Sequence, residues 1–332
     1  MRIAIDAMGG DNAPAVVIEG AVQALQRASV PLHAVLFGRE EAIQAELAAH
    51  DDLDEQQVTV VHAPEEIGMS EAPSSSVKNK TRSSIHLGLQ AHKKGEVDAF
   101  VSAGNTGAIM GASLFILGRI PGVKRPTVIG FFPTRKGSCI VSDLGTNVDC
   151  KPTHLVQFAQ MGAIYARYVY DRADPSVGLL NIGEEPGKGN EQSKATYELL
   201  QQADTINFGG NIEGSDIFHH AADVVICDGF VGNILLKFGE SLIDVLTTAT
   251  RNEIKRQELP AEQQQVVKGV LGQVIEGFDA EERGGAPLLG VDGHVLIGHG
   301  ESSVRAIRQM ILSAVDVAQE GIVRPIKAAF AE

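Results

Sequence analysis

The stretch RIAIDAMGGDNAP (residues 2–14) joins a short apolar run to a pair of glycines, an acid and a proline. Residues 3–5 predict a buried strand. Asp11, or the asparagine after it, predicts the cap of a helix that has the proline in its first turn. Between strand and helix, Gly9 and Gly10 leave the backbone N–H groups of the turn uncovered by bulky side chains. This strand, turn and helix indicate an α/β fold.

Apolar runs alternate with amphipathic helical segments along the rest of the chain. Short continuous apolar runs suit strands that are buried on both faces. Their alternation with helices predicts a largely parallel sheet. The predicted strands are residues 3–5, 34–37, 58–61, 99–102, 127–131, 139–142, 177–181, 224–227 and 295–297.

The composition is that of an ordinary globular protein, with 332 residues of which 44% are hydrophobic and 21% charged. Its formal net charge of -14 argues against nucleic-acid binding, which needs a basic face. The three cysteines, Cys139, Cys150 and Cys227, are widely spaced and form neither a disulfide framework nor a zinc-binding pattern. This cysteine usage favours a reducing cytoplasm.

One uncharged segment, residues 99–118, is long enough to be considered as a membrane helix. Ser102, Gly104, Asn105 and Thr106 interrupt it near its start, and such residues are typical of turns. We therefore predict a buried strand, a turn and a buried helix in this segment.

A helical hairpin is predicted for residues 234–278. Apolar residues recur at helical spacing in 234–257 and again in 263–278, with Pro260 in the polar link between them. The hairpin can pair with a second subunit or pack within the monomer, and its sequence favours neither alternative. We expect it to lie within a single catalytic domain that spans residues 1–332.

Six predicted strands run into small polar turns, at residues 6–12, 102–107, 143–147, 181–190, 228–233 and 298–302. In a parallel sheet such turns gather at the carboxyl edge, where ligands bind, and free N–H groups at helix starts attract anions. We therefore predict one shared site for an anion or an oxyanion. Its predicted binding residues are Gly9, Gly10, Asp11, Ser102, Gly104, Asn105, Thr106, Asp143, Gly145, Asn147, Asn181, Gly183, Gly189, Asp228, Gly229 and Gly232.

Three further residues in these turns are candidate catalytic residues. Lys188 lies among glycines and can neutralise a small anion as a point charge, although a solvated loop lysine is the alternative. Asn233 adds a neutral donor at the start of the hairpin. His299, between two glycines, is a candidate phosphate ligand or proton donor, with a structural histidine as the alternative.

Several common catalytic motifs are missing from the sequence. The segment GEEPGKG around Lys188 is one residue short of a Walker loop and lacks its hydroxyl, and no G-x-G-x-x-G opens the first helix. Neither G-x-S-x-G nor H-E-x-x-H occurs, so a standard hydrolase and a zinc protease are not indicated. We expect no metal and no cofactor.

The motifs MRIAIDAMGGD, SAGNTGA, VDCKPTHLVQFAQMG, LLNIGEEPGKGNE, GNIEG, CDGFVGN and GHGESS occur in this order along nearly the whole chain. Together they resemble PlsX, the bacterial phosphate acyltransferase family. The resemblance implies a three-layer α/β/α sandwich, Rossmann-like, as in phosphotransacetylases and isocitrate-dehydrogenase-like proteins. It also implies transfer of a long acyl group from acyl carrier protein to inorganic phosphate, which gives acyl phosphate for phospholipid synthesis.

The resemblance further implies partners and a location. Members of the family are homodimers joined by helical pairs, act in the cytoplasm, in part as peripheral membrane proteins, and supply a membrane glycerol-3-phosphate acyltransferase. Here the basic run that the family has before a paired serine is spread over Lys78, Lys80 and Arg82. The tip of the predicted hairpin is polar, and Arg251, Lys255 and Arg256 can meet anionic lipid there.

For the reaction we expect direct attack of phosphate on the thioester. Lys188 would neutralise phosphate, Asn233 and the backbone of residues 229–232 would orient phosphate or the oxyanion, and His299 would donate a proton. An acyl-enzyme on Cys150 is the alternative route. Two other functions stay open: an NAD-dependent dehydrogenase of related fold, and a non-catalytic scaffold for carrier protein or membrane.

Overall fold

The structure, a computed structural model, describes residues 1–50, 53–276 and 284–331. The chain divides into two compact units. Unit 1 comprises Met1–Gly130, Gln160–Pro175 and Glu281–Glu332, and unit 2 comprises Phe131–Ala159 and Ser176–Ala280. That the chain acts as a single domain stays a prediction.

The sheet of unit 1 has the strand order β3-β2-β1-β4-β11-β10-β5. Strands β1 to β4 and β11 pair in parallel, and β10 is antiparallel to both of its neighbours. The mostly parallel α/β fold predicted from the sequence is confirmed. The strands are β1 (Arg2–Asp6), β2 (His33–Gly38), β3 (Val58–His62), β4 (Ala99–Ser102), β5 (Thr127–Thr134), β10 (Ala286–Leu289) and β11 (Val295–Ile297).

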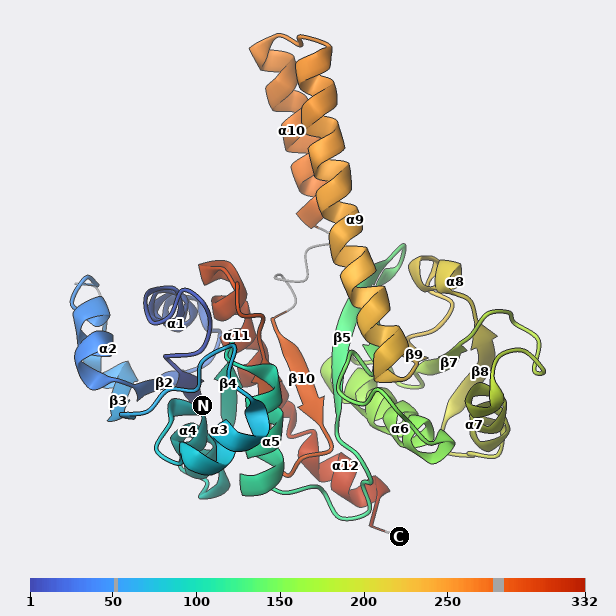
Figure 1. The fold of residues 1–332 in the computed structure, drawn as a ribbon, viewed down its shortest axis with the longest axis horizontal. Coiled ribbons are helices and arrows are strands. Elements are labelled where there is room, and N and C mark those ends of the chain that lie inside the picture. Colours follow the sequence, from blue (N-terminus) through green and yellow to red (C-terminus); the bar gives the residue numbers. More distant parts are fainter. Residues whose placement is uncertain (51–52, 277–283, 332) are drawn as a thin grey trace. The chain divides into compact units, whose positions relative to one another are not determined.

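Helices cover both faces of this sheet (Figure 1). Alternate strand residues point to opposite faces, so Ile3 and Ile5 pack under α1 and α11, whereas Ala4 faces the cluster formed with α4 and α5. The segment 99–118 forms a strand, a turn and a helix, as predicted. The helices of unit 1 are α1 (Ala15–Arg27), α2 (Glu40–Leu47), η1 (Glu55–Gln57), α3 (Pro73–Asn79), α4 (Ser84–Lys93), α5 (Thr106–Ile116), α11 (Val304–Glu320) and α12 (Val323–Ala329).

The start of α1 differs from the prediction. Its N-cap is Pro14, and no side chain caps the helix. The Pro14 carbonyl accepts the first helical hydrogen bond, from the Ile18 N–H, at 2.9 Å. Asp11 lies one turn earlier, where its N–H donates to the Gly300 carbonyl at 2.8 Å. The prediction that Asp11 or its neighbour caps the helix is therefore wrong.

The sheet of unit 2 has the order β6-β9-β7-β8, and all its neighbours are parallel. Buried residues of β6 and β9 pack with partly buried Leu235 and Leu236 at the start of α9. Helix α6 (Pro152–Val169) begins in unit 2 and ends in unit 1. The other elements are β6 (Gly137–Ser142), β7 (Ser176–Leu180), β8 (Asn207–Ile212), β9 (Val224–Ile226), α7 (Glu191–Gln201) and α8 (Gly214–His219).

The helical hairpin of unit 2 consists of α9 (Gly229–Arg256) and α10 (Ala261–Glu276), which lie side by side (Figure 1). Helix α9 begins five residues before the predicted start, because the Asp228 side chain accepts a hydrogen bond from the Val231 N–H and caps it there. The predicted end of the second helix, residues 277–278, lies outside the described residues. Exposed apolar side chains follow both helices: Phe238, Leu242, Val245, Leu246, Val266, Val270 and Val274.

Among the helices that the structure describes, none combines the length and apolar character needed to cross a membrane.

Candidate functional site

A buried carboxylate joins the first two predicted turns of unit 1. Asp6, at the end of β1, is 2% exposed and accepts hydrogen bonds from the Ser102 hydroxyl at 2.6 Å and from the Met8 N–H at 3.1 Å. The same hydroxyl accepts a hydrogen bond from the Gly104 N–H at 3.0 Å. Because the Ser102 proton points to Asp6, Ser102 holds the two turns together.

Glycines allow these turns to approach each other closely. A β carbon on Gly9 would lie 2.6 Å from Asp6 Oδ2 and 2.8 Å from the Gly104 nitrogen. Gly10 has a left-handed backbone, with φ of 109°, and the carbonyl of Gly300 lies against it. Glycine is therefore the residue that fits without rearrangement at position 9, where space is lacking, and at position 10, where the backbone is left-handed.

The outer residues of this edge are open to solvent. Asp11 and Thr106 are exposed, and Thr106 is the first residue of α5. His299 is also exposed, on the turn after β11, and its Nδ1 accepts a hydrogen bond from the Glu301 N–H at 3.3 Å. Its role as a ligand, proton donor or structural residue stays a prediction.

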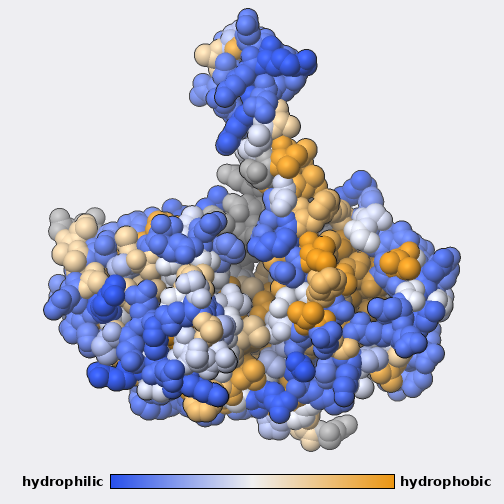
Figure 2. Space-filling view, viewed as in Figure 1, coloured by the Kyte–Doolittle hydropathy of each residue, from blue (hydrophilic) through white to orange (hydrophobic). Residues whose placement is uncertain are grey.

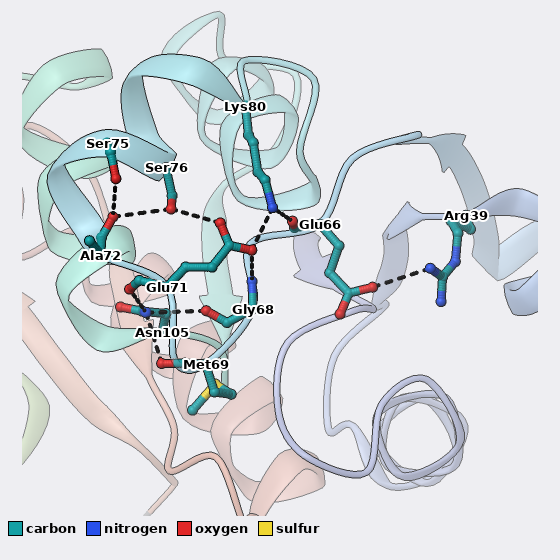
Figure 3. Close-up of polar contacts among 10 residues, drawn as sticks. All are labelled: Arg39, Glu66, Gly68, Met69, Glu71, Ala72, Ser75, Ser76, Lys80 and Asn105. Atoms are coloured by element: carbon teal, nitrogen blue, oxygen red, sulfur yellow. Dashed lines mark hydrogen bonds and ion pairs between the residues drawn. The ribbon is translucent and has the colours of Figure 1, made fainter.

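The side chain of Asn105 makes its hydrogen bonds to other groups of the protein. Its oxygen caps α5 through the Ala108 N–H at 3.1 Å, and its nitrogen lies within 3.0 to 3.3 Å of the carbonyl oxygens of Gly68, Met69 and Glu71 (Figure 3). It therefore fixes the segment before α3 against the start of α5.

Lys80 directly follows α3 and contacts the segment before that helix (Figure 3). It donates to Glu71 and, at 2.6 Å, to the carbonyl oxygen of Glu66. The hydrogen bond from Lys80, followed by those from the Gly68 N–H and the Ser76 hydroxyl, lowers the pKa of Glu71 to about 2. The Lys80 ammonium therefore bonds within the protein, whereas the side chains of Lys78 and Arg82 are exposed to solvent.

In unit 2 a second buried carboxylate organises the turn after β6. Asp143 is fully buried and accepts hydrogen bonds from the Thr146 N–H at 2.8 Å and from the Asn147 amide. Burial raises the pKa of Asp143, and these hydrogen bonds oppose the rise. Asn147 itself is 5% exposed, so this turn is rigidly held.

The turn after β6 packs against the first turn of α9. The Gly229 N–H donates to the Asn147 carbonyl at 2.8 Å, and a β carbon on Gly232 would overlap the Asp143 carbonyl. A β carbon on Gly145, whose φ is 112°, would lie 3.3 Å from Asn233 Cβ. Asn233 is exposed, and within the described part of the chain its amide has no hydrogen-bond partner.

Lys188 lies in the long turn after β7. The Asn181 amide donates to the Lys188 carbonyl at 3.2 Å, and a β carbon on Gly183 would lie 3.0 Å from Lys188 Cγ. Gly189 has φ of 89°, and a side chain there would overlap Asn181. The Lys188 ammonium is half exposed and lies 3.8 Å from Glu185 Oε2, so it can reach an anion in solvent.

The cysteines of unit 2 differ in exposure. Cys139 and Cys227 are buried, as predicted, and burial first of all raises the pKa of the Cys227 thiol. Cys150 is half-buried, and its thiol donates to the Asn147 carbonyl at 3.3 Å. The alternative role of Cys150 as a nucleophile stays a prediction.

The predicted residues thus gather at carboxyl strand ends of their own unit. In unit 1 they follow β1, β4 and β11, and in unit 2 they follow β6, β7 and β9. The sequence prediction missed the organising role of Asp6. The sequence feature that could have indicated this role is an acidic residue between Ile5 and Ala7 in an otherwise apolar run.

Comparisons with known proteins agree over almost the whole chain. A family model described as "Fatty acid synthesis protein" matches residues 1–324. A phosphate acyltransferase of Salinibacter ruber (strain DSM 13855 / M31) is 58% identical over 329 residues, covering 99% of this chain and 97% of the relative. A phosphate acyltransferase of Chlorobaculum parvum (strain DSM 263 / NCIMB 8327) is 46% identical over 330 residues, covering 97% and 96%.

Two solved structures share the fold. A phosphotransacetylase from Streptococcus pyogenes matches with a TM-score of 0.63 at 18% identity, and EutD phosphotransacetylase from Staphylococcus aureus matches with a TM-score of 0.62 at 17% identity. Both matches cover 96% of this chain and 94% of the other. With the family match over residues 1–324 and relatives of up to 58% identity, the chain belongs to the phosphate acyltransferases, a family of enzymes of fatty acid synthesis.

Proposed function

We propose that this enzyme transfers a long-chain acyl group from acyl carrier protein to inorganic phosphate and releases acyl phosphate. The observation that carries the proposal is the exposed amide of Asn233, which lies in the second turn of α9 and in contact with Gly145. An unpaired donor on a rigid helix start suits an anion or an oxyanion.

In the proposed reaction a phosphate oxygen attacks the thioester carbonyl. A carbon–oxygen bond forms, the carbonyl becomes an oxyanion, and the carbon–sulfur bond then breaks. Phosphate groups lose their second proton near pH ~6, so the attacking dianion is available without a strong base. The leaving thiolate takes one proton from solvent or from a nearby donor, since a thiol has a pKa of about 8.5.

The roles follow from the chemistry of each group. Lys188 neutralises the phosphate, because its half-exposed ammonium has only the distant contact with Glu185 among described residues. Asn233 orients the phosphate or stabilises the oxyanion through its side-chain amide, since the N–H groups of Gly229 and Val231 already donate to Asn147 and Asp228. Orientation of the two reactants supplies much of the rate.

The other predicted residues have supporting roles in this proposal. Asp143, Asn147 and Gly145 hold the turn that contacts Asn233. The turns of unit 1 are proposed ligand contacts through their backbone N–H groups, and His299 is the proposed proton donor. Ser102 acts there through Asp6 and Gly104.

We also propose a homodimer joined by the α9–α10 hairpin, because its exposed apolar residues would be buried by contact with a second subunit. Sedimentation of the wild type and of a Leu242→Ser/Leu246→Ser variant tests this, with a shift from dimer to monomer expected. The proposed location is the cytoplasm, with peripheral contact at the inner face of the membrane through exposed Arg251 and Lys255. There the product would pass to a membrane glycerol-3-phosphate acyltransferase.

A single reaction tests the main proposal. Purified protein is mixed with palmitoyl-acyl carrier protein and inorganic phosphate, and acyl phosphate is trapped with hydroxylamine. We expect product that depends on both phosphate and protein. Product that forms equally without phosphate, or none at all, would refute the proposal.

A further inference from the structure

Exposed apolar side chains lie on or directly beside the predicted site turns of unit 2, and four of them are more than half exposed. Val148 is 54% exposed, Ile182 80%, Phe230 58% and Ile234 54%. Val148 follows Asn147 and Ile182 follows Asn181, while Phe230 and Ile234 lie on α9 beside Asn233. Single exposed apolar residues are common on protein surfaces, but several around one polar centre indicate a binding surface.

The backbone contacts bring these turns together. The hydrogen bond from the Gly229 N–H to the Asn147 carbonyl joins the residues that precede Phe230 and Val148. Strand β7 pairs with β9, with Leu179 opposite Ile226, so the turn that carries Ile182 leaves the sheet beside the turn that starts α9.

Two of the four residues also share one face of a helix. Phe230 and Ile234 are four residues apart on α9, which makes their side chains neighbours. Figure 2 shows hydrophobic residues gathered along α9, including its first turns. An apolar surface therefore starts next to Asn233.

We infer that Val148, Ile182, Phe230 and Ile234 contact the acyl chain of the substrate and set the enzyme's preference for long chains. The inference rests on the proposed function and deepens it. A thioester carbonyl held near Asn233 has its chain attached at the same carbon, so the distal part of a long chain extends over the apolar surface formed by these side chains, which a short chain does not cover. Each methylene removed from water changes affinity by a factor of roughly four.

A second copy of the chain is the competing occupant of this surface. A helix-pairing face would use residues of α9 and α10 alone, such as Phe238, Leu242 and Val245. Val148 and Ile182 lie on separate turns outside the hairpin, and both adjoin predicted site residues. The acyl chain is therefore the occupant that explains all four residues.

The test compares donors of different length on the full chain. We measure kcat/KM for acyl carrier protein carrying a 16-carbon or a 4-carbon acyl group, with the wild type, Phe230→Ser/Ile234→Ser and Ile182→Asn. We expect a loss of about tenfold or more with the long donor and a change of less than about twofold with the short donor. Phe115→Ser is the matched control, because Phe115 is 79% exposed at the far end of α5.

Each other outcome overturns the inference. Equal losses with both donors would show a general effect on the site, and unchanged kcat/KM would show that the side chains do not contact the chain. Dissociation of a wild-type dimer by the double variant, measured by sedimentation, would assign the surface to a second copy. A wild type that makes no acyl phosphate from either donor would refute the proposed function itself, and the inference with it.

Discussion

Gly145 lies directly against Asn233, and a β carbon on the glycine would stand 3.3 Å from that of the asparagine. The left-handed backbone of Gly145, with φ of 112°, directs the turn toward the helix. The position of Asn233 on α9 therefore depends on the absence of a side chain at residue 145, in the turn after β6.

Alanine replacements at Gly145 and at a second left-handed glycine distinguish the effect of the contact with Asn233 from the effect of backbone strain. Gly137 has a similar φ of 116° but nothing within 4 Å of its added β carbon, so Gly137→Ala is a matched control. We expect both variants to lose about 1–3 kcal/mol of unfolding free energy in urea titrations. Only Gly145→Ala is expected to lose acyl phosphate turnover, by about tenfold or more. Equal turnover in the two variants would contradict a role for this contact.

Lys188→Ala tests the proposed phosphate contact. Its ammonium is half exposed and makes one long contact, with Glu185 at 3.8 Å, so the melting temperature should stay near that of the wild type. Turnover should fall by about 10²–10³-fold, as for loss of one charged or polar group that stabilises a transition state. Lys194→Ala, on the exposed surface of α7, is the control and should retain turnover. A Lys188→Ala enzyme of near-normal rate would remove this lysine from the mechanism.

Ser102→Ala tests the hydrogen-bond network in unit 1. The change removes the bond to Asp6 and leaves the Gly104 N–H without its acceptor. We expect a loss of about 1–3 kcal/mol in unfolding free energy, measured by urea titration. Ser75→Ala removes only an exposed hydroxyl that donates to the Ala72 carbonyl, and should change stability by less than about 0.5 kcal/mol. Similar losses in both variants would argue against the network.

His86 is expected to make the fold sensitive to acid. It is 1% exposed, and neither ring nitrogen has a hydrogen-bond partner among described residues. Burial lowers the pKa of His86, with an opposing effect from Glu65. The unfolded chain then binds the proton more readily, so the contribution of His86 is complete above about pH 6.5 and is lost as the pH falls toward the lower folded value.

The measurement compares melting temperatures at pH 7.5 and 5.5. His86→Leu should be at least as stable as the wild type at pH 7.5, because an apolar group replaces an unpaired polar one. It should also lose less stability at pH 5.5, although the lowered pKa values of half-buried His92 and His294 keep part of the pH dependence. His219→Leu, at an exposed position, should follow the wild type. An unchanged pH dependence in His86→Leu would contradict this account.

The strands that the sequence predicts correctly are continuous apolar runs, such as residues 99–102. A strand that is buried on both faces needs apolar side chains at every position, so its sequence is easy to recognise. It missed β8 and β10. In β8 the pair Gly209 and Gly210 interrupts the apolar pattern, and Pro287 does so in β10. Strand β10 pairs with β5, where Leu288 lies opposite Val128, and β8 pairs with β7, and local sequence does not reveal these partners.

The candidate site shows the same limit. The turns were predictable because glycine and asparagine follow each apolar run. The pairing of Asp6 with Ser102 was not, since 96 residues separate them and only the register of β1 beside β4 brings them together. The start of α9 at Gly229 was also missed, because glycines within a helix obscure its beginning.

Helix α9 carries Asn233 and the exposed apolar residues Phe238, Leu242, Val245 and Leu246 on one uninterrupted segment, Gly229–Arg256. Each residue turns a helix by about 100°, so one residue inserted between Asn233 and Leu242 would rotate everything beyond it by that angle. A change of seven residues restores the rotation to within about 20°. A seven-residue change in the length of this segment would therefore preserve the rotational phase between Asn233 and the apolar residues of α9, whereas a one-residue change would not.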